Sequence, residues 1–330
     1  MRHRNLIQGH QENKPNPPQK KKNKNKSQDK QPNLAVPIAI LSTVFFLLAA
    51  DLVVKEIRKQ KSNAKITTQK DSLQVQTASF ESDKVEKTLV KNAPFDTTFS
   101  LQQRRFNRVR DAYQLKFDTL KATLYQAGVD TVAYDIYLRA FKKEQVLEVW
   151  AKGSSEVKFK FVKSYAFCKS SGTVGPKRRE GDKQIPEGFY HIDRFNPSSN
   201  YYLSLGINYP NRADQISTGD SVNLGKDIFI HGGCETVGCI PITNDQIKEL
   251  YVLATEAKSR GQKKISITIY PTKLTDGNFK ALSDEYAKDK KLVDFWKTLK
   301  RGYDYFEGCK ELPTVRIPAS GRYVISDKCK

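Results

Sequence analysis

The sequence lacks the features that mark several classes of protein. It has no Cys-x-x-Cys pair, and structural zinc sites usually need two such spaced pairs of ligands. It has no dense basic run with interleaved aromatic residues, so the net charge of +21 argues only weakly for nucleic acid, and we expect no nucleic-acid partner. Apolar residues are not scarce: they form 38% of the chain, which argues against global disorder.

The five cysteines are an odd number, so at least one thiol is unpaired in a monomer. Cys309 and Cys329 both lie near the C-terminus. They would form a bridge in an oxidising compartment, and two free thiols are an equal alternative.

Charge is absent from residues 34–50, LAVPIAILSTVFFLLAA. With residues 52–54 this apolar run reaches the length that spans a bilayer, about 17–25 residues. A basic segment precedes it, so the positive-inside rule keeps the N-terminus in the cytoplasm. A cleaved signal peptide and a buried soluble helix are the alternatives. We predict a single-pass membrane protein whose folded domain is exported, made of a basic disordered tail (1–33), a transmembrane signal anchor (34–54), a polar linker (55–98) and a folded domain (99–330).

The folded domain mixes helices with many short strands. Apolar spacing predicts helices at 101–127, 244–259 and 279–300. Runs rich in Val, Ile, Tyr and Phe, separated by Gly/Pro/Asn-rich joins, predict strands. They lie at 134–141, 145–152, 157–167, 188–193, 201–207, 263–270 and 322–325. The pattern indicates an α+β class with a sandwich-like or barrel-like sheet and argues against a doubly wound parallel sheet.

The stretch IFIHGGCETVGCIPIT (228–243) holds the chemistry. It places His231 at a strand end, two glycines in a turn, and Cys239 just before a helix. A thiol near an imidazole suits a Cys–His nucleophile pair. The backbone N–H groups of Gly238 and Cys239 could stabilise an oxyanion.

Three interpretations of this stretch stay open on the residues alone. The first is catalytic and favours Cys239 as nucleophile over Cys234. The second is structural, with both cysteines as small buried apolar residues. The third is a metal site formed by His231, Cys234 and Cys239, with a fourth ligand from Cys168, His191 or an acid.

Four blocks occur in an order that resembles the L,D-transpeptidase catalytic (YkuD-type) domain family, in its YafK-type branch. The similarity spans roughly residues 130–325. The blocks are SSGTVGPKRREGDKQIPEGFY (170–190), YLSLGINYPN (202–211), IHGGCETVGC (230–239) and FWKTLKRGYDYFEG (295–308).

The resemblance implies a mostly β, sandwich-like domain with short helices. It implies that Cys239 is the nucleophile, that His231 is the general base, and that the Gly232 carbonyl orients the imidazole. The implied substrate is a peptidoglycan stem peptide containing diaminopimelate, cleaved through a Cys239 thioester, with no metal and no organic cofactor. A protein linked to the wall is a further candidate substrate.

The sequence departs from the family pattern at two positions. Many relatives have a histidine directly before the catalytic Gly-Cys and an arginine two residues after the cysteine, whereas this chain has Val237 and Pro241. This favours hydrolysis over cross-linking. The alternatives are an amidase or L,D-carboxypeptidase-type hydrolase only, and a non-catalytic wall-binding scaffold. Weaker candidates for substrate contacts are Tyr202, Tyr209, Asn211, Thr236, and a carboxylate clamp of Lys177, Arg178 and Arg179.

Overall fold

The computed structural model describes residues 98–219 and 222–325. The predicted tail and anchor, and the linker up to residue 97, lie outside these residues, so their assignment stays a prediction. Among the helices that the structure does describe, none is long and apolar enough to cross a bilayer.

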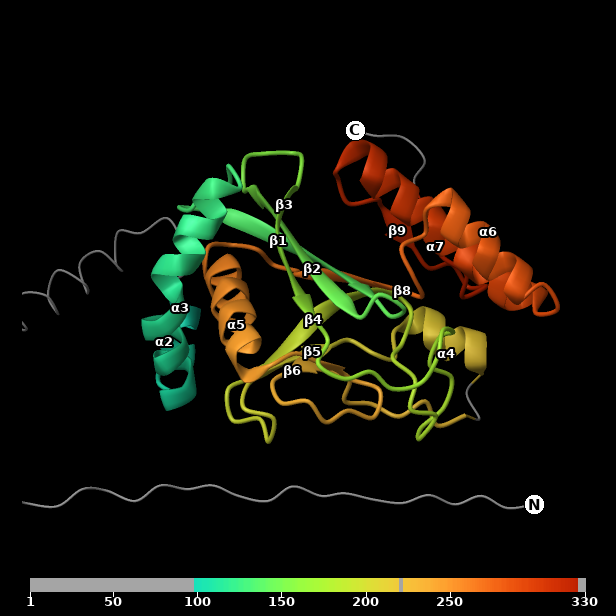
Figure 1. Ribbon diagram of the computed structural model, residues 1–330, viewed down its shortest axis with the longest axis horizontal. Coiled ribbons are helices and arrows are strands. Elements are labelled where there is room, and N and C mark those ends of the chain that lie inside the picture. Colours follow the sequence, from blue (N-terminus) through green and yellow to red (C-terminus); the bar gives the residue numbers. More distant parts are fainter. Residues whose placement is uncertain (1–97, 220–221, 326–330) are drawn as a thin grey trace, which may run out of the picture. The chain divides into compact units, whose positions relative to one another are not determined.

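The folded domain combines helices and strands in one unit (Figure 1). Its helices are α2 (Thr98–Gln103), α3 (Asn107–Gln126), α4 (Arg212–Thr218), α5 (Asn244–Ser259), α6 (Asp276–Glu285) and α7 (Lys290–Cys309). Its strands are β1 (Tyr134–Phe141), β2 (Val146–Gly153), β3 (Lys160–Ala166), β4 (Gly188–Asn196), β5 (Ser204–Ile207), β6 (Phe229–His231), β7 (Ile240–Pro241), β8 (Ser266–Tyr270), β9 (Val315–Arg316) and β10 (Val324–Ile325).

Local sequence signals located most of these elements. β1 and α5 have the predicted bounds, and the Thr243 hydroxyl caps α5 by accepting from the Gln246 N–H. The predicted helix at 279–300 is wrong in one respect, because the structure contains two helices there. Asp289 caps the second, α7, by accepting from the Leu292 N–H. This cap starts a new helix inside an otherwise helical pattern.

Eight strands form one mixed sheet in the order β3-β2-β1-β8-β4-β5-β6-β7. The pairs β1/β8 and β6/β7 are parallel, and the other pairs are antiparallel. A separate two-stranded ladder joins β9 to β10.

The sheet curls at β4. The first half of β4 (188–191) pairs with β8, and its second half (192–196) pairs with β5 across a register shift near Ile192. A strand that changes partner at such an irregularity bends the sheet. The bend sets the short strands β5, β6 and β7 apart from the longer ladders of β1, β2 and β8.

Helices cover both faces of the central strands. In β1, Ile136 and Leu138 belong to the same buried cluster as residues of α3 and α5. Alternate residues point the other way, and Tyr137 packs with Phe306 of α7. Figure 1 shows the α3/α5 pair on one side of the sheet and the α6/α7 pair on the other. The α+β class is therefore confirmed, whereas the sandwich-like core is corrected to a single curled sheet whose central strands are covered by helices.

Candidate active site

His231 ends the short strand β6, where it lies opposite Ser204 of β5. Its side chain is buried, and its Nδ1 lies 2.6 Å from the Gly232 carbonyl oxygen. A carbonyl oxygen only accepts hydrogen bonds, so Nδ1 carries the proton and the neutral ring leaves Nε2 as an unprotonated base. Burial lowers the pKa of His231, and the hydrogen bond to Gly232 opposes that shift. The predicted contact between the Gly232 carbonyl and the imidazole is present in the structure.

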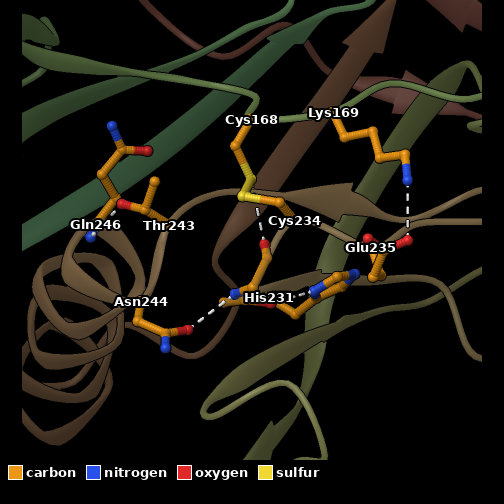
Figure 2. The surroundings of a disulfide bond; sticks show 10 residues. Cys168, Lys169, His231, Cys234, Glu235, Thr243, Asn244 and Gln246 are labelled. Carbon is orange, nitrogen blue, oxygen red and sulfur yellow. Dashed lines mark hydrogen bonds and ion pairs between the residues drawn. A yellow bond between two sulfur atoms is a disulfide. The ribbon is translucent and has the colours of Figure 1, made fainter.

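The turn after His231 requires glycine. A Cβ at Gly232 would lie 2.6 Å from Asn244 Oδ1 and 2.8 Å from the Tyr201 carbonyl oxygen. Gly233 has a φ of +71°, which L side chains rarely adopt, and its N–H donates to Asn244 Oδ1 at 2.8 Å. Figure 2 shows Asn244, the first residue of α5, reaching back to this turn. The helix start therefore fixes the backbone that carries the base.

Cys239 lies directly before β7, the parallel neighbour of β6. Because Ile240 pairs with Ile230, Cys239 lies beside Phe229, which shares a strand face with His231. The thiol is free and half-buried, and it donates to the Asp227 carbonyl oxygen at 3.6 Å. Burial raises the pKa of Cys239, with a smaller opposing effect from the Phe229 backbone. The resting cysteine is therefore a thiol that shares a face of the sheet with a neutral imidazole.

Both predicted oxyanion donors already have acceptors in this structure. The Gly238 N–H donates to Ser171 Oγ at 2.7 Å, and the Cys239 N–H donates to Thr236 Oγ1 at 3.0 Å. The Thr236 hydroxyl also donates to the Cys239 carbonyl oxygen at 2.8 Å. Thr236, predicted as a weak substrate contact, thus closes the turn that presents the nucleophile.

A disulfide joins Cys168 to Cys234 beside this turn (Figure 2). It ties the segment after β3 to the loop between His231 and Cys239. The metal-site interpretation is corrected, because the sulfur atoms of Cys168 and Cys234 are bonded to each other. Within residues 98–219 and 222–325, no group of three or more His, Cys, Asp or Glu side chains could hold a metal ion. Cys309 is also disulfide-bonded, and Cys329 lies outside the described residues.

Two of the predicted substrate-contact residues are used inside the fold. Tyr209 is buried, and its hydroxyl donates to the Leu224 carbonyl oxygen at 3.2 Å. Asn211 caps α4 through its side-chain oxygen, while its Nδ2 donates to Phe189 O and Tyr323 Oη. These hydrogen bonds occupy the polar groups of both side chains, so the structure gives them architectural roles.

The aromatic residue beside the base is Tyr201, which precedes the predicted Tyr202. The Tyr201 ring lies over the His231 ring with centroids 4.5 Å apart, and the Tyr201 side chain is 45% exposed. Tyr202 instead contacts the Arg108 guanidinium. The adjacent tyrosines at 201 and 202 were the signal in the sequence, but only the tertiary structure shows that Tyr201 faces the imidazole.

The predicted carboxylate clamp divides into two environments. Lys177 is buried, and its Nζ bonds to Asp182 Oδ1 at 2.7 Å and to the Arg179 carbonyl oxygen at 2.8 Å. The Arg178 guanidinium lies over the Phe295 ring at 5.7 Å, in a cleft apart from the Lys177–Asp182 pair. Lys177 therefore holds the loop together, and Arg178 is the clamp residue that borders an open space.

Comparisons with known proteins show which family the chain resembles. Residues 135–267 match the L,D-transpeptidase catalytic domain (YkuD) family. The chain is 39% identical over 193 residues to YafK of Escherichia coli (strain K12), itself named only as a candidate L,D-transpeptidase. That match covers 58% of this chain and 74% of YafK, and the YafK of E. coli O157:H7 matches equally well.

Solved structures show weaker similarity. The helical cell shape determining protein Pgp2 of Campylobacter jejuni is 17% identical with a TM-score of 0.34, covering 61% of this chain and 80% of Pgp2. Bd1075 of Bdellovibrio bacteriovorus is 18% identical with a TM-score of 0.31, covering 53% of this chain and 62% of Bd1075. Similarity at this level supports no argument about function, whereas the sequence match to YafK does establish the family. The chain belongs to the L,D-transpeptidase catalytic domain (YkuD) family.

Proposed function

We propose that this protein is a cysteine acyltransferase or hydrolase that acts on peptidoglycan stem peptides containing diaminopimelate. Family membership supports an enzyme that modifies peptidoglycan. One observation supports the assignment of residues above all others: the hydrogen bond from Nδ1 to the Gly232 carbonyl oxygen leaves Nε2 of His231 free on the face it shares with the Cys239 thiol.

The pKa shifts of Cys239 and His231 indicate the protonation states in which the two groups would begin the reaction. Burial raises the pKa of the thiol and lowers that of the imidazole, so both groups are neutral at rest. The thiol would exchange the Asp227 carbonyl for His231 Nε2, and its proton would move to that nitrogen as Sγ attacks the substrate carbonyl carbon. A preformed thiolate–imidazolium pair is not required.

The remaining steps follow from acyl transfer. Attack forms a C–S bond and places negative charge on the carbonyl oxygen. When the C–N bond breaks, imidazolium returns its proton to the leaving amine, and a Cys239 thioester is left. Water or an amine then gives up a proton to His231, attacks the thioester and releases the thiol. The products are a carboxylate in hydrolysis or a new amide in transfer.

The oxyanion would compete for backbone N–H groups that are already bonded. The Gly238 N–H donates to Ser171, whose hydroxyl is a movable partner, so a substrate oxyanion can take its place. The disulfide at Cys168 and Cys234 holds the Ser171 segment close to the turn. We infer that this segment contributes to the oxyanion environment.

Hydrolysis is the reaction that we favour. Val237 is 67% exposed at the position before Gly238, where it offers no polar group to hold an incoming amine. Water needs no such group. An amidase or L,D-carboxypeptidase-type activity therefore fits the site better than cross-linking.

The place of action follows from the sequence. The charge-free run at 34–50 after a basic tail supports a single-pass anchor in the inner membrane with the domain in the periplasm. A disulfide-bonded domain fits that compartment, because such bonds persist in an oxidising environment. A wall-linked protein would then be a substrate within reach.

The test uses the full chain in detergent with diaminopimelate-containing muropeptides and with wall-linked protein fragments. Product masses are measured for wild type, Cys239→Ala and the double variant Cys168→Ser/Cys234→Ser, which keeps Cys239. We expect loss of turnover in Cys239→Ala alone and an acyl adduct on Cys239 in wild type. Equal behaviour of all three proteins would contradict the mechanism and favour the wall-binding scaffold. Adding a free amine separates transfer from hydrolysis.

A further inference from the structure

A concave site lies beside the turn that carries Cys239. This basic cleft has a volume of about 840 Å³ and is bounded by the loop between β3 and β4, by α4, by the first turns of α7 and by residues 320–323. Figure 1 shows α4 and α7 at the same end of the domain. The volume falls in the range of about 300–1,000 Å³ that is typical of small-ligand sites.

Positive charge dominates the lining. Five cationic side chains face three carboxyl groups: Arg178, Lys291, Lys297, Arg301 and Arg322 against Asp214, Asp289 and Asp294. Two of the acids already have partners, since Asp289 caps α7 and Asp214 accepts from Tyr190 and the Asn211 N–H.

Several of the cations form no ion pair with a described residue. In the part of the chain that the structure describes, no ion pair involves Arg178, Lys297 or Arg322. The Arg178 guanidinium lies over the Phe295 ring instead, with its Cζ 5.7 Å from the ring centroid. A guanidinium held in this way keeps its N–H donors available for a planar anion.

Apolar surface lies between the charges. Phe295 and Tyr323 lie with ring centroids 6.4 Å apart, and Val174 and Leu292 extend the same wall. The cleft therefore suits a ligand that carries both carboxylates and short aliphatic groups. This combination is typical of an acidic peptide.

The cleft and the catalytic turn share one wall. Gln184 lines the cleft, and its carbonyl oxygen would lie 2.9 Å from a Cβ built at Gly238. A ligand in the cleft is thus separated from the nucleophile's loop by the thickness of a single residue. The cleft therefore adjoins the loop that carries Cys239.

A buried ion pair anchors that wall. Lys142 Nζ lies 3.0 Å from Glu187 Oε1 and donates to the Gly175 and Ile185 carbonyl oxygens at 2.7 and 2.9 Å. Glu187 Oε2 accepts from Trp296 Nε1 of α7 at 2.7 Å. These bonds join the loop to the helix, so both sides of the cleft are held in one arrangement before any ligand binds.

We propose that the basic cleft binds the carboxylate-bearing portion of the peptide substrate, and that it selects for acidic peptides. The proposal rests on the proposed function for the position of the scissile amide. Residues 289–301 and 320–323 of the lining lie outside the matched catalytic region at 135–267. The C-terminal segment therefore adds specificity to the catalytic domain.

The test separates binding from chemistry. The probe is the tripeptide L-alanyl-γ-D-glutamyl-diaminopimelate, compared with its fully amidated form, and both are titrated calorimetrically into the full-length Cys239→Ala protein. We expect Lys297→Gln/Arg322→Gln to weaken tripeptide binding at least about tenfold and to leave binding of the amidated form unchanged. The matched control, Lys121→Gln/Lys280→Gln, removes the same charge from exposed sites outside the cleft.

Turnover of the diaminopimelate-containing muropeptides gives an independent readout. With Cys239 intact, the cleft variant should raise KM for these muropeptides by the same factor and leave kcat unchanged. The cleft proposal would be overturned if the cleft variant and the control variant bound the tripeptide equally well, or if the tripeptide and its amidated form bound with equal affinity. If the tripeptide binds through the cleft but the muropeptides are not turned over, the proposed function fails and the cleft proposal survives.

Discussion

The two ends of the sheet are built differently. At one end, β1 and β2 pair over eight residues each, and β1 also pairs in parallel with β8. At the other end, β6 has three residues and β7 has two. There the structure relies on the Asn244 and Thr236 side chains, on Ser171 and on a disulfide.

The arginine side chains of β1 and of the basic cleft also differ in their partners. Arg139 of β1 is buried between Glu148 and Glu307, with 2.7 Å contacts to each, and lies over the Phe306 ring. In the basic cleft, Arg178 and Arg322 lack such carboxylate partners among the described residues. The comparison teaches that buried charge is paired beside the long ladders, whereas the basic cleft keeps guanidinium groups that form no ion pair.

The largest effect should come from changing the nucleophile. Cys239→Ser replaces sulfur by a far less reactive hydroxyl of similar size, so we expect kcat to fall at least about a thousandfold. The free energy of unfolding should change by less than about 1 kcal/mol, as measured by urea denaturation. Retention of a tenth of wild-type turnover would contradict the role of Cys239.

At the long-ladder end we expect a substitution to lower stability and to leave kcat unchanged. Arg139→Met leaves the Glu148 carboxylate buried without its main partner, which should lower the free energy of unfolding by about 3–5 kcal/mol. The protein that remains folded should keep its kcat. Lys280→Ala removes a fully exposed ion pair with Asp284 and should leave the urea midpoint unchanged. A stable Arg139→Met protein would remove the contrast between the two ends.

Removing the disulfide should lower both the stability of the protein and its kcat. Cys168→Ser/Cys234→Ser releases a cross-link between residues 66 apart in sequence, and we expect a loss of about 2–4 kcal/mol. Ser171 should then hold the Gly238 N–H less well and lower kcat severalfold. Thermal unfolding and turnover are measured with and without a reducing agent, and the double variant should respond to it less than wild type does, since it keeps the disulfide of Cys309.

The pH dependence follows from the base. Because burial lowers the pKa of His231 below its usual 6.5, the neutral ring should persist into mildly acidic solution. The acid limb of kcat/KM should therefore report an apparent pKa below 6.5. A limb at or above 6.5 would show that the imidazole is not buried in the active state.

The same shift affects stability. The unfolded chain binds the His231 proton at a higher pH than the folded one, so the stabilisation present above about pH 6.5 is lost as pH falls toward the folded pKa. Unfolding free energies at pH 5 and pH 7.5 should differ less in His231→Gln than in wild type. An equal pH dependence in both proteins would count against this buried neutral ring.

A smaller loss of stability should come from the turn before the nucleophile. Thr236→Val keeps the shape of the side chain and removes the hydroxyl that bonds both the N–H and the carbonyl of Cys239. We expect about a tenfold lower kcat and a stability loss of about 1 kcal/mol. Thr236→Ser should restore most of both. A serine variant as impaired as the valine variant would show that the hydroxyl is not sufficient to hold the turn.

Local patterns were sufficient for much of the fold and for part of the site. The spacing of apolar residues placed β1 and α5, because hydrophobic periodicity acts within a few residues. The HGG turn beside a cysteine, together with the family resemblance, predicted His231, Gly232 and Cys239, and their catalytic roles stay a prediction. The roles of Tyr209 and Asn211 could not be predicted, because their partners lie at Leu224, Phe189 and Tyr323.

The sequence by itself determined the class of the domain, the order of its elements and the candidate Cys–His pair. Tertiary structure decided which partner each group has: Cys168 for Cys234, Ser171 for the Gly238 N–H, Tyr201 for the imidazole, and the C-terminal segment for the basic cleft. The physical reason is that these contacts join residues far apart in the chain. Their pairing depends on how the sheet curls at β4, which no short window of sequence encodes.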